Sequence, residues 1–257
     1  MSPSTLKLLA LSAALLYYFA FFTDLGPKRR PLLSRLLWGM GFACNLTLVV
    51  NNYLVNGYVP LVSMYQVLTF LGVCFLPIWL MMRFVRRSGW MSPCFTLAAA
   101  VVMTGLCFMN AEAKWEFAPA LQSPFFIPHV LVYMISYCMG AVAFLLTVIS
   151  FTKKGKDLAR MEQGIYDCIC VVFPFMTMGL FLGSIWANEI WGHFWSWDTK
   201  ESFSLATWAI YMLYLHFRRS AKLKKYARVF ALIGFAGIIV TFLFANVFAG
   251  GIHSYSM

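Results

Sequence analysis

Long runs of apolar residues alternate with short polar segments along the whole chain. A helix needs roughly 20 apolar residues to cross a bilayer, at about 1.5 Å of rise per residue. Eight runs approach or reach that length, and they lie at about 5–22, 36–54, 61–82, 90–109, 126–151, 165–186, 202–217 and 226–249. The seventh is short and directly follows a polar stretch. The pattern predicts an all-α, polytopic integral membrane protein with about eight transmembrane helices.

Composition agrees with this prediction and narrows the function. Of 257 residues, 61% are hydrophobic and 11% are charged, against about 45–50% and about 25% in soluble domains. A soluble globular enzyme is therefore excluded, and so is a disordered chain, which needs low hydrophobicity. We expect residues 1–257 to form a single transmembrane domain that works in or at the membrane, or with a partner that supplies an aqueous domain.

The net charge of +11 becomes informative once the basic residues are located. Cytoplasmic loops of membrane proteins collect Lys and Arg. Of the 20 basic residues, 17 lie in four alternate connections: Lys28, Arg29, Arg30, Arg35, Arg83, Arg86, Arg87, Lys153, Lys154, Lys156, Arg160, Arg218, Arg219, Lys222, Lys224, Lys225 and Arg228. This predicts that both termini, with loops 54–60, 110–125 and 187–201, lie on the non-cytoplasmic side. The excess of basic residues is thus explained by the orientation of the chain in a lipid bilayer. We therefore expect no nucleic-acid partner.

The most unusual segment is tryptophan-rich and occupies about 186–201. Trp191, Trp195 and Trp197 fall within seven residues, and Trp186 precedes them. Tryptophan favours membrane interfaces, which explains one or two of them. A dense run, broken by Gly192 and closed by charged residues, also fits a stacking surface for a large planar ligand. Composition alone leaves both interpretations open.

Three of the four histidines fall on the predicted outer side. His129 lies about one turn inside the fifth run, His193 lies within the tryptophan segment, and His253 follows the eighth run. Any one of them alone is typical of an interfacial hydrogen-bonding residue. His129 and His253 together, on either side of a tryptophan platform, favour a bis-imidazole metal site, and haem takes axial histidines.

His216 is placed differently. It follows Glu201 by 15 residues, or about 22 Å along a helix, at the predicted cytoplasmic end of the seventh run. It is either an interfacial residue at a helix C-terminus or a second, inner ligand position. Asp198 and Glu201 are one turn apart and are expected to cap this helix. We find no H-E-x-x-H, P-loop or G-x-S-x-G motif, so no hydrolytic site is predicted.

These segments resemble a known family. WGHFWSWDTKES resembles the W-G-x-x-W-x-W-D ("WWD") motif of haem-handling proteins. The following helix ending in Tyr-Leu-His, the GGIHSYS segment at 250–256 and the segment VPLVSMYQ at 59–66 are similar to the system II cytochrome c biogenesis family CcsA, also called ResC. The resemblance runs from about residue 45 to the C-terminus.

The resemblance implies a protein of the cytoplasmic (inner) membrane with its active face on the periplasmic side. Such a protein transports haem b outward and presents it to apocytochrome c, whose C-x-x-C-H thiols join the haem vinyl groups. His129 and His253 would be the outer axial ligands, and His216 an inner ligand. The platform would consist of Trp191, Trp195, Trp197 and Asp198. A CcsB/ResB-like partner would supply the second inner histidine and complete the cytochrome c synthase.

The chain departs from the family pattern at two positions. Thr199 stands where the family usually has Pro, and Gln66 replaces a usual Glu. His193 falls at a variable position of the motif and is not assigned as a ligand. Two other functions compete. A CcmC-type protein delivers haem to a chaperone, but six spans are expected there. A b-type membrane cytochrome needs histidine pairs on facing helices at both levels, whereas this sequence offers only His216 on the inner side.

Overall fold

The computed structural model describes residues 1–25, 30–110 and 118–244. These ranges contain the α-helices α1 (Pro3–Leu25), α2 (Pro31–Asn56), α3 (Met64–Val85), α4 (Ser92–Cys107), α5 (Phe126–Ser150), α6 (Gly155–Trp191), α7 (Thr199–Arg219) and α8 (Lys224–Ile239). Short helices lie at Gly89–Met91 (η1) and Pro119–Gln122 (η2), and α8 continues as a π-helix over Val240–Phe244 (η3). No strand occurs within the three described ranges. The predicted all-α class is confirmed.

Seven helices of the described chain are long and apolar enough to cross a membrane. The protein is therefore a multi-pass membrane protein. Among the eight described α-helices, α7 does not meet this criterion. It has 21 residues, but it carries Lys200 and Glu201 in its first turn and Arg218 and Arg219 at its end. Its apolar part is correspondingly short, as the sequence indicated. Helix α7 packs against α6 and α8, so part of its surface is covered by protein.

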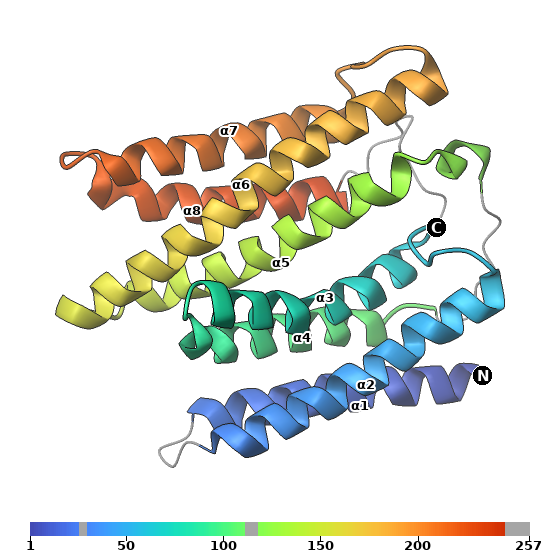
Figure 1. Cartoon of the computed structure of the whole chain (residues 1–257), viewed down its shortest axis with the longest axis horizontal. Coiled ribbons are helices and arrows are strands. Elements are labelled where there is room, and N and C mark those ends of the chain that lie inside the picture. Colours follow the sequence, from blue (N-terminus) through green and yellow to red (C-terminus); the bar gives the residue numbers. More distant parts are fainter. Residues whose placement is uncertain (26–29, 111–117, 245–257) are drawn as a thin grey trace. The chain divides into compact units, whose positions relative to one another are not determined.

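The chain divides into two compact units, Met1–Leu121 and Gln122–Met257. In the first unit, α1 packs against α2 and α4, and α3 packs against the same two helices (Figure 1). The contact between α1 and α2 is close, because a Cβ built on Gly41 would lie 2.7 Å from the Tyr17 ring. In α2, buried Asn45 is oriented to donate to the Thr69 carbonyl and accept from the Val73 amide of α3, each at 3.0 Å.

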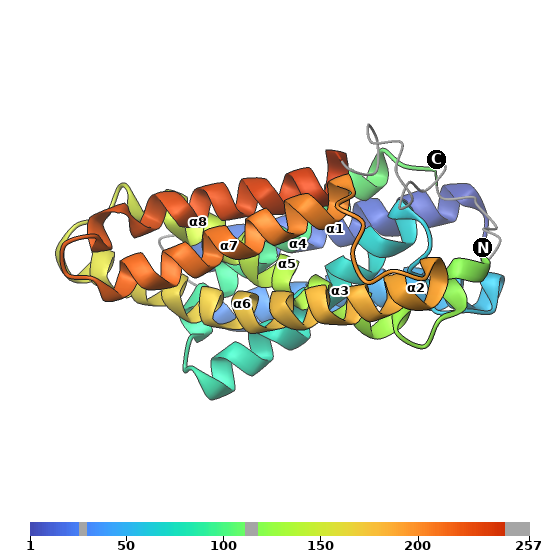
Figure 2. The same cartoon turned by 90° about the horizontal axis from the view of Figure 1, so that it is seen from above.

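In the second unit, α5 packs against α6 and α8, and α7 lies beside α8 (Figure 2). Helix α6 has 37 residues, or about 55 Å, which exceeds a hydrocarbon core of about 30 Å. The extra turns begin with the polar segment that follows Lys154. Both ends of α6 therefore extend beyond the apolar run that the sequence predicts at 165–186, and its C-terminal end carries Trp186 and Trp191.

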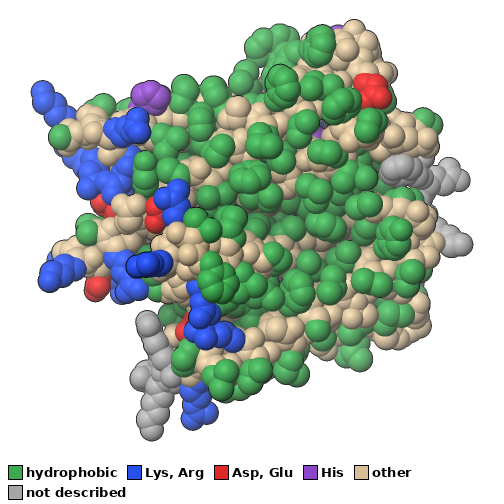
Figure 3. All heavy atoms as spheres, in the orientation of Figure 1, with side chains coloured by type: hydrophobic (Ala, Val, Ile, Leu, Met, Phe, Trp, Pro, Cys, Tyr) green, Lys and Arg blue, Asp and Glu red, His purple; other side chains and the backbone are tan. Residues whose placement is uncertain are grey.

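Hydrophobic side chains cover the flanks of the helices, and Lys and Arg side chains gather near helix ends (Figure 3). In the first unit, Arg83, Arg86 and Arg87 lie at the connection from α3 to α4. In the second unit, the connections from α5 to α6 and from α7 to α8 carry the basic residues and meet at the same end. This grouping matches the pattern from which the sequence topology was predicted. The orientation in the membrane stays a prediction.

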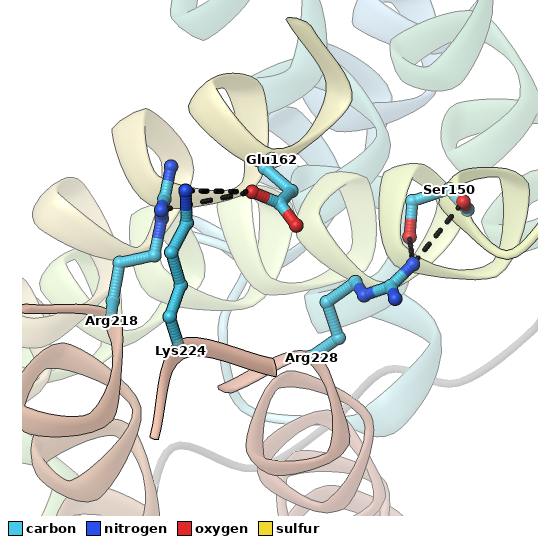
Figure 4. A network of polar contacts seen from close by, with 5 residues as sticks. All are labelled: Ser150, Glu162, Arg218, Lys224 and Arg228. Atoms are coloured by element: carbon cyan, nitrogen blue, oxygen red, sulfur yellow. Dashed lines mark hydrogen bonds and ion pairs between the residues drawn. The ribbon is translucent and has the colours of Figure 1, made fainter. Parts of the chain in front are cut away.

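Polar contacts link four helices at the basic end of the second unit (Figure 4). The Glu162 carboxylate of α6 pairs with Arg218 Nη1 of α7 at 3.7 Å and with Lys224 Nζ of α8 at 3.3 Å. Arg228 Nη1 donates to the carbonyl and the hydroxyl oxygen of Ser150, each at 3.3 Å. The ends of α5, α6, α7 and α8 are thereby tied together.

Candidate functional site

The N-terminus of α5 is fixed against the C-terminal part of α6. The Ser123 hydroxyl accepts from the Phe125 amide at 3.1 Å and donates to the Glu189 carboxylate. Helix α5 then begins at Phe126, so His129 lies in its first turn. This is the position predicted from the apolar pattern, at the end of the second unit opposite the basic residues.

His129 has a defined tautomer. Its Nδ1 lies 2.9 Å from the carbonyl oxygen of Gly179 in α6. A carbonyl oxygen only accepts hydrogen bonds, so Nδ1 carries the hydrogen, and in the neutral ring Nε2 carries the lone pair. The ring is thus oriented by α6 with the nitrogen that binds metals at Nε2.

Aromatic rings surround His129, and we call this set the His129 cluster: His129, Tyr133, Trp186, Trp191 and Phe126. The imidazole centroid lies 5.8 Å from the Trp186 ring, tilted by 30°, and 5.1 Å from the Tyr133 ring, edge to face. Trp186 also contacts Trp191 at 5.1 Å and Phe126 at 5.5 Å. Only 4% of Trp186 is exposed, so this tryptophan belongs to a packed cluster and not to a lipid-facing belt.

Beyond α6, the chain turns sharply into the tryptophan-rich segment. Gly192 adopts φ 78°, and its amide donates to the Asn188 carbonyl at 3.0 Å. His193 Nδ1 lies 2.8 Å from the Trp191 carbonyl oxygen. Because glycine adopts a left-handed backbone without steric cost, Gly192 ends α6 and redirects the chain.

Trp195 and Trp197 form a second aromatic pair, with centroids 5.7 Å apart and planes at 82°. Trp197 adopts φ 59°, a left-handed conformation that is strained for a bulky residue. Its side chain is 70% exposed. The Trp195 indole N–H is buried and has no hydrogen-bond partner within the described ranges. The segment therefore combines an exposed aromatic face with a buried donor.

Asp198 and Glu201 hold this segment at the start of α7. Asp198 is the N-cap, and its Oδ1 accepts from the Glu201 amide at 2.8 Å. Glu201 Oε2 accepts in return from the Ser196 amide at 2.7 Å and from the Ser196 hydroxyl at 3.1 Å. The predicted cap is confirmed. Thr199 takes the first helical position, where proline is favoured but not required, so the helix starts there despite the departure from the family pattern.

Lys200 lies in the first turn of α7, ahead of the apolar part of that helix. Burial lowers the pKa of its ammonium group to about 8, and the Asp198 carboxylate opposes that shift. Desolvation disfavours the charged form of a lysine, whereas a nearby carboxylate favours it. A partly buried ammonium group therefore lies near the Asp198 cap, at the end of the tryptophan-rich segment.

His216 lies near the other end of α7. It is exposed, and its Nδ1 lies 2.9 Å from the Met212 carbonyl oxygen, which again leaves the lone pair on Nε2. It belongs to the same continuous helix as Glu201, so the predicted separation of about 22 Å follows from helical geometry. The second unit thus carries one histidine site at each end.

Gln66 has a structural role in the first unit. Its side-chain oxygen accepts from the Val62 amide at 3.0 Å and from the Ser63 amide at 3.4 Å. The Ser63 hydroxyl accepts from the Gln66 amide at 3.3 Å, which completes a capping box at the start of α3. An amide oxygen performs this accepting role as a carboxylate does. The replacement of Glu by Gln therefore leaves this cap intact.

The structure brings together some of the predicted site residues. His129 and Trp191 share one cluster, and Trp195, Trp197 and Asp198 share the neighbouring segment. His216 lies far along α7, and His253 lies outside the described residues. No cluster of three or more His, Cys, Asp or Glu that could hold a bare metal ion occurs among the residues described. Axial haem ligation needs only one or two imidazoles.

Sequence reasoning missed Tyr133, Gly179 and Gly183, and it left Trp186 out of the site. The spacing offered a signal, since Gly179, Gly183 and Trp186 recur at i, i+4 and i+7 on one face of α6, and His129 and Tyr133 are i and i+4 on α5.

Fold and site together define a class: a multi-pass, all-α membrane protein with a histidine held among tryptophans at one end of its helices. A profile of the family described as "Cytochrome C assembly protein" matches residues 45–253. The chain belongs to that family, which gives it a role in cytochrome c maturation and implies that it meets haem and apocytochrome c.

Several relatives carry the description "Cytochrome c biogenesis protein CcsA". The protein from Chlamydomonas reinhardtii is 30% identical over 241 residues, which cover 87% of this chain and 68% of the relative. The one from Nymphaea alba is 28% identical over 255 residues, which cover 83% and 82%. The one from Trieres chinensis is 28% identical over 251 residues, which cover 80% of each. The resemblance to the CcsA family is thereby confirmed.

Proposed function

We propose that this chain transports haem b across the cytoplasmic membrane and presents it on the periplasmic face for covalent attachment to apocytochrome c. It acts as the membrane subunit of a system II cytochrome c synthase. The two compact units of the chain belong to one haem-handling domain. The eight described α-helices favour this CcsA-type role over a CcmC-type role, for which six spans are expected.

The observation that carries the proposal is the setting of His129. Its Nδ1 is engaged by the Gly179 carbonyl, and its ring lies against Trp186. Histidines that bind metals are commonly oriented in this way through the other ring nitrogen. We assign His129 and His253 as the outer axial ligands of haem.

The neighbouring segment suits a large, flat and anionic substrate. Trp191, Trp195 and Trp197 supply the aromatic surface, and Asp198 fixes its backbone through the cap of α7. The Trp195 indole N–H, which has no partner within the described ranges, and the Lys200 ammonium group are donors suited to haem propionates. These residues orient the substrate, whereas its vinyl groups and the apocytochrome thiols supply the reactivity.

The attachment reaction needs no redox change in its bonding step. Each cysteine thiol of the C-x-x-C-H motif adds across one vinyl group. A sulfur–carbon bond forms, and the proton ends on the other vinyl carbon. With His129 and His253 as ligands, the iron would have no open coordination position during the addition, so the role of this chain would be to position haem and limit its side reactions.

We assign His216 to an inner haem position. Its exposed ring fits a ligand that is completed by a second histidine from a CcsB/ResB-like partner. The basic end of the second unit faces the cytoplasm in this proposal, and the His129 cluster and both termini face the periplasm.

The test uses the chain co-expressed with its partner. His129→Ala combined with His253→Ala should abolish the bis-histidine spectrum of the outer haem and stop cytochrome c maturation. His216→Ala should deplete the inner haem and leave the outer haem in place, because His216 lies about 22 Å along α7 from Glu201.

His193→Ala is the matched control, since His193 lies in the same segment and is not assigned as a ligand. It should retain haem and activity. An unchanged spectrum and normal maturation in the double variant would contradict the outer-ligand assignment. Retained bis-histidine haem without any involvement in thioether formation would contradict the synthase role.

A further inference from the structure

Two glycines of α6 contact the rings of the His129 cluster. A Cβ built on Gly183 would lie 2.6 Å from His129 Cε1 and 2.8 Å from Nδ1. A Cβ built on Gly179 would lie 2.5 to 2.9 Å from three atoms of the Tyr133 ring. Real Cβ atoms are not found at such distances, so any larger residue at either position must displace a ring.

The two glycines belong to one face of α6. Residues four apart lie above one another on a helix, so Gly179 and Gly183 form a shallow slot and Trp186 continues the same face. His129 and Tyr133 are also four apart, on α5. The two side chains therefore enter the slot one above the other.

The residues of the slot also orient the His129 imidazole. The Gly179 carbonyl oxygen accepts from His129 Nδ1 at 2.9 Å, while the missing side chain of Gly183 lets the imidazole approach the α6 backbone. Trp186 lies along the ring at a tilt of 30°. Position, tautomer and plane of the imidazole are thus all set by α6.

We propose that Gly179 and Gly183 are positioning residues for His129. Gly183 gives the imidazole its place, and Gly179 fixes its tautomer so that Nε2 is the coordinating nitrogen. The inference rests on the proposed role of His129 as an axial haem ligand. The geometry of this ligand, and with it the properties of bound haem, is set by α6 as well as by α5.

The expected effects follow from the geometry. Partners in the outer shell of a metal site typically change affinity by about 10–100-fold when they are lost. Gly183→Ala should displace His129, weaken outer haem binding by about that factor and shift its reduction potential. Added imidazole should restore the low-spin spectrum, because the ligand is misplaced and the pocket is still present. Gly179→Ala retains the carbonyl and displaces Tyr133, so its effect should be smaller and should be relieved by Tyr133→Ala.

Gly234→Ala is the matched control. Its Cβ would lie 2.8 Å from the Tyr211 ring in the same unit, so it overpacks a helix contact that does not involve His129. We expect it to lower thermal stability while leaving the reduction potential and spectrum of bound haem unchanged.

A double variant keeps the test decisive if Gly183→Ala folds poorly. With His129→Ala present, the ring that the added methyl group would strike is gone, so His129→Ala/Gly183→Ala should be as stable as His129→Ala alone. If Gly183→Ala destabilises both backgrounds equally, the positioning role is wrong. It is also wrong if Gly183→Ala binds outer haem with wild-type affinity and potential while His129→Ala loses it. Wild-type haem binding by His129→Ala would instead refute the proposed function itself.

Discussion

The cap at the start of α7 offers a sharp test of how the tryptophan segment is held. Replacing Asp198 by Ala removes the acceptor that lies 2.8 Å from the Glu201 amide. Loss of an N-cap side chain costs about 0.5–2 kcal/mol, typically about 1. The strained backbone of Trp197, at φ 59°, costs about 1–3 kcal/mol and is tolerated only while neighbouring contacts hold it.

These magnitudes predict a measurable opening. A loss of about 1–2 kcal/mol increases the open population by a factor of about 5–30. Hydrogen–deuterium exchange at the Ser196 and Glu201 amides reports that population, because both donate to the contacts at this cap. In Asp198→Ala both amides should exchange about 5–30-fold faster.

Asp198→Asn is the matched variant, since asparagine caps helices about as well as aspartate. Its exchange rates should remain within about twofold of the wild type, because the amide oxygen replaces the carboxylate oxygen as acceptor. If Asp198→Asn opens as much as Asp198→Ala, the charge holds the segment and the capping argument is refuted. Unchanged exchange in Asp198→Ala would refute it as well.

Three further predictions concern packing, the polar network and pH. Gly41→Ala should destabilise the first unit by about 1–3 kcal/mol through overpacking against Tyr17. Gly39→Ala, whose Cβ would meet nothing within 4 Å, should be neutral or stabilising. Denaturant titration of both variants in detergent distinguishes these outcomes. Glu162→Gln breaks two partly exposed ion pairs and should cost about 1 kcal/mol at most, or about 2–4 °C in Tm. The loss should shrink in high salt, whereas Lys222→Gln, in the same connection and outside both ion pairs, is a control that should leave Tm unchanged. Folding lowers the pKa of Lys200 from 10.5 to about 8, so between these pH values the folded protein has released this proton and the unfolded chain still holds it. Stability should therefore rise with pH across that window. Lys200→Met should lack that rise in a series of thermal melts, and a pH profile identical to that of the wild type would contradict the lowered pKa of Lys200.

Much of the fold could be predicted because hydropathy reports lipid contact. The run at 126–151 corresponds to α5, Phe126–Ser150, almost residue for residue. The same signal could not give the full extent of α6, whose first turns carry Lys156, Asp157 and Arg160. Those turns are helical through backbone hydrogen bonds and contacts with other helices, which an apolar run does not reveal.

The site was predictable in its residue types and less so in its geometry. Tryptophan density and histidine placement indicated where the chemistry lies, and the capping role of Asp198 followed from its spacing to Glu201. The slot of Gly179 and Gly183 could not be inferred from these residues alone, since glycine also occurs in helices for simple helix packing. Only the close approach of His129 to α6, seen in the structure, shows that the slot accommodates a side chain of the site.

The identity of the ligands that bind the iron at the outer site decides whether His129 holds haem. Near-infrared magnetic circular dichroism of the ferric, haem-loaded wild-type complex reports the pair of axial ligands. We predict a low-spin, bis-histidine signature that loses its outer component in His129→Ala and regains it when imidazole is added. A high-spin or single-histidine signature in the wild type, or an outer component that survives in His129→Ala, would contradict ligation of the outer haem by His129 and His253.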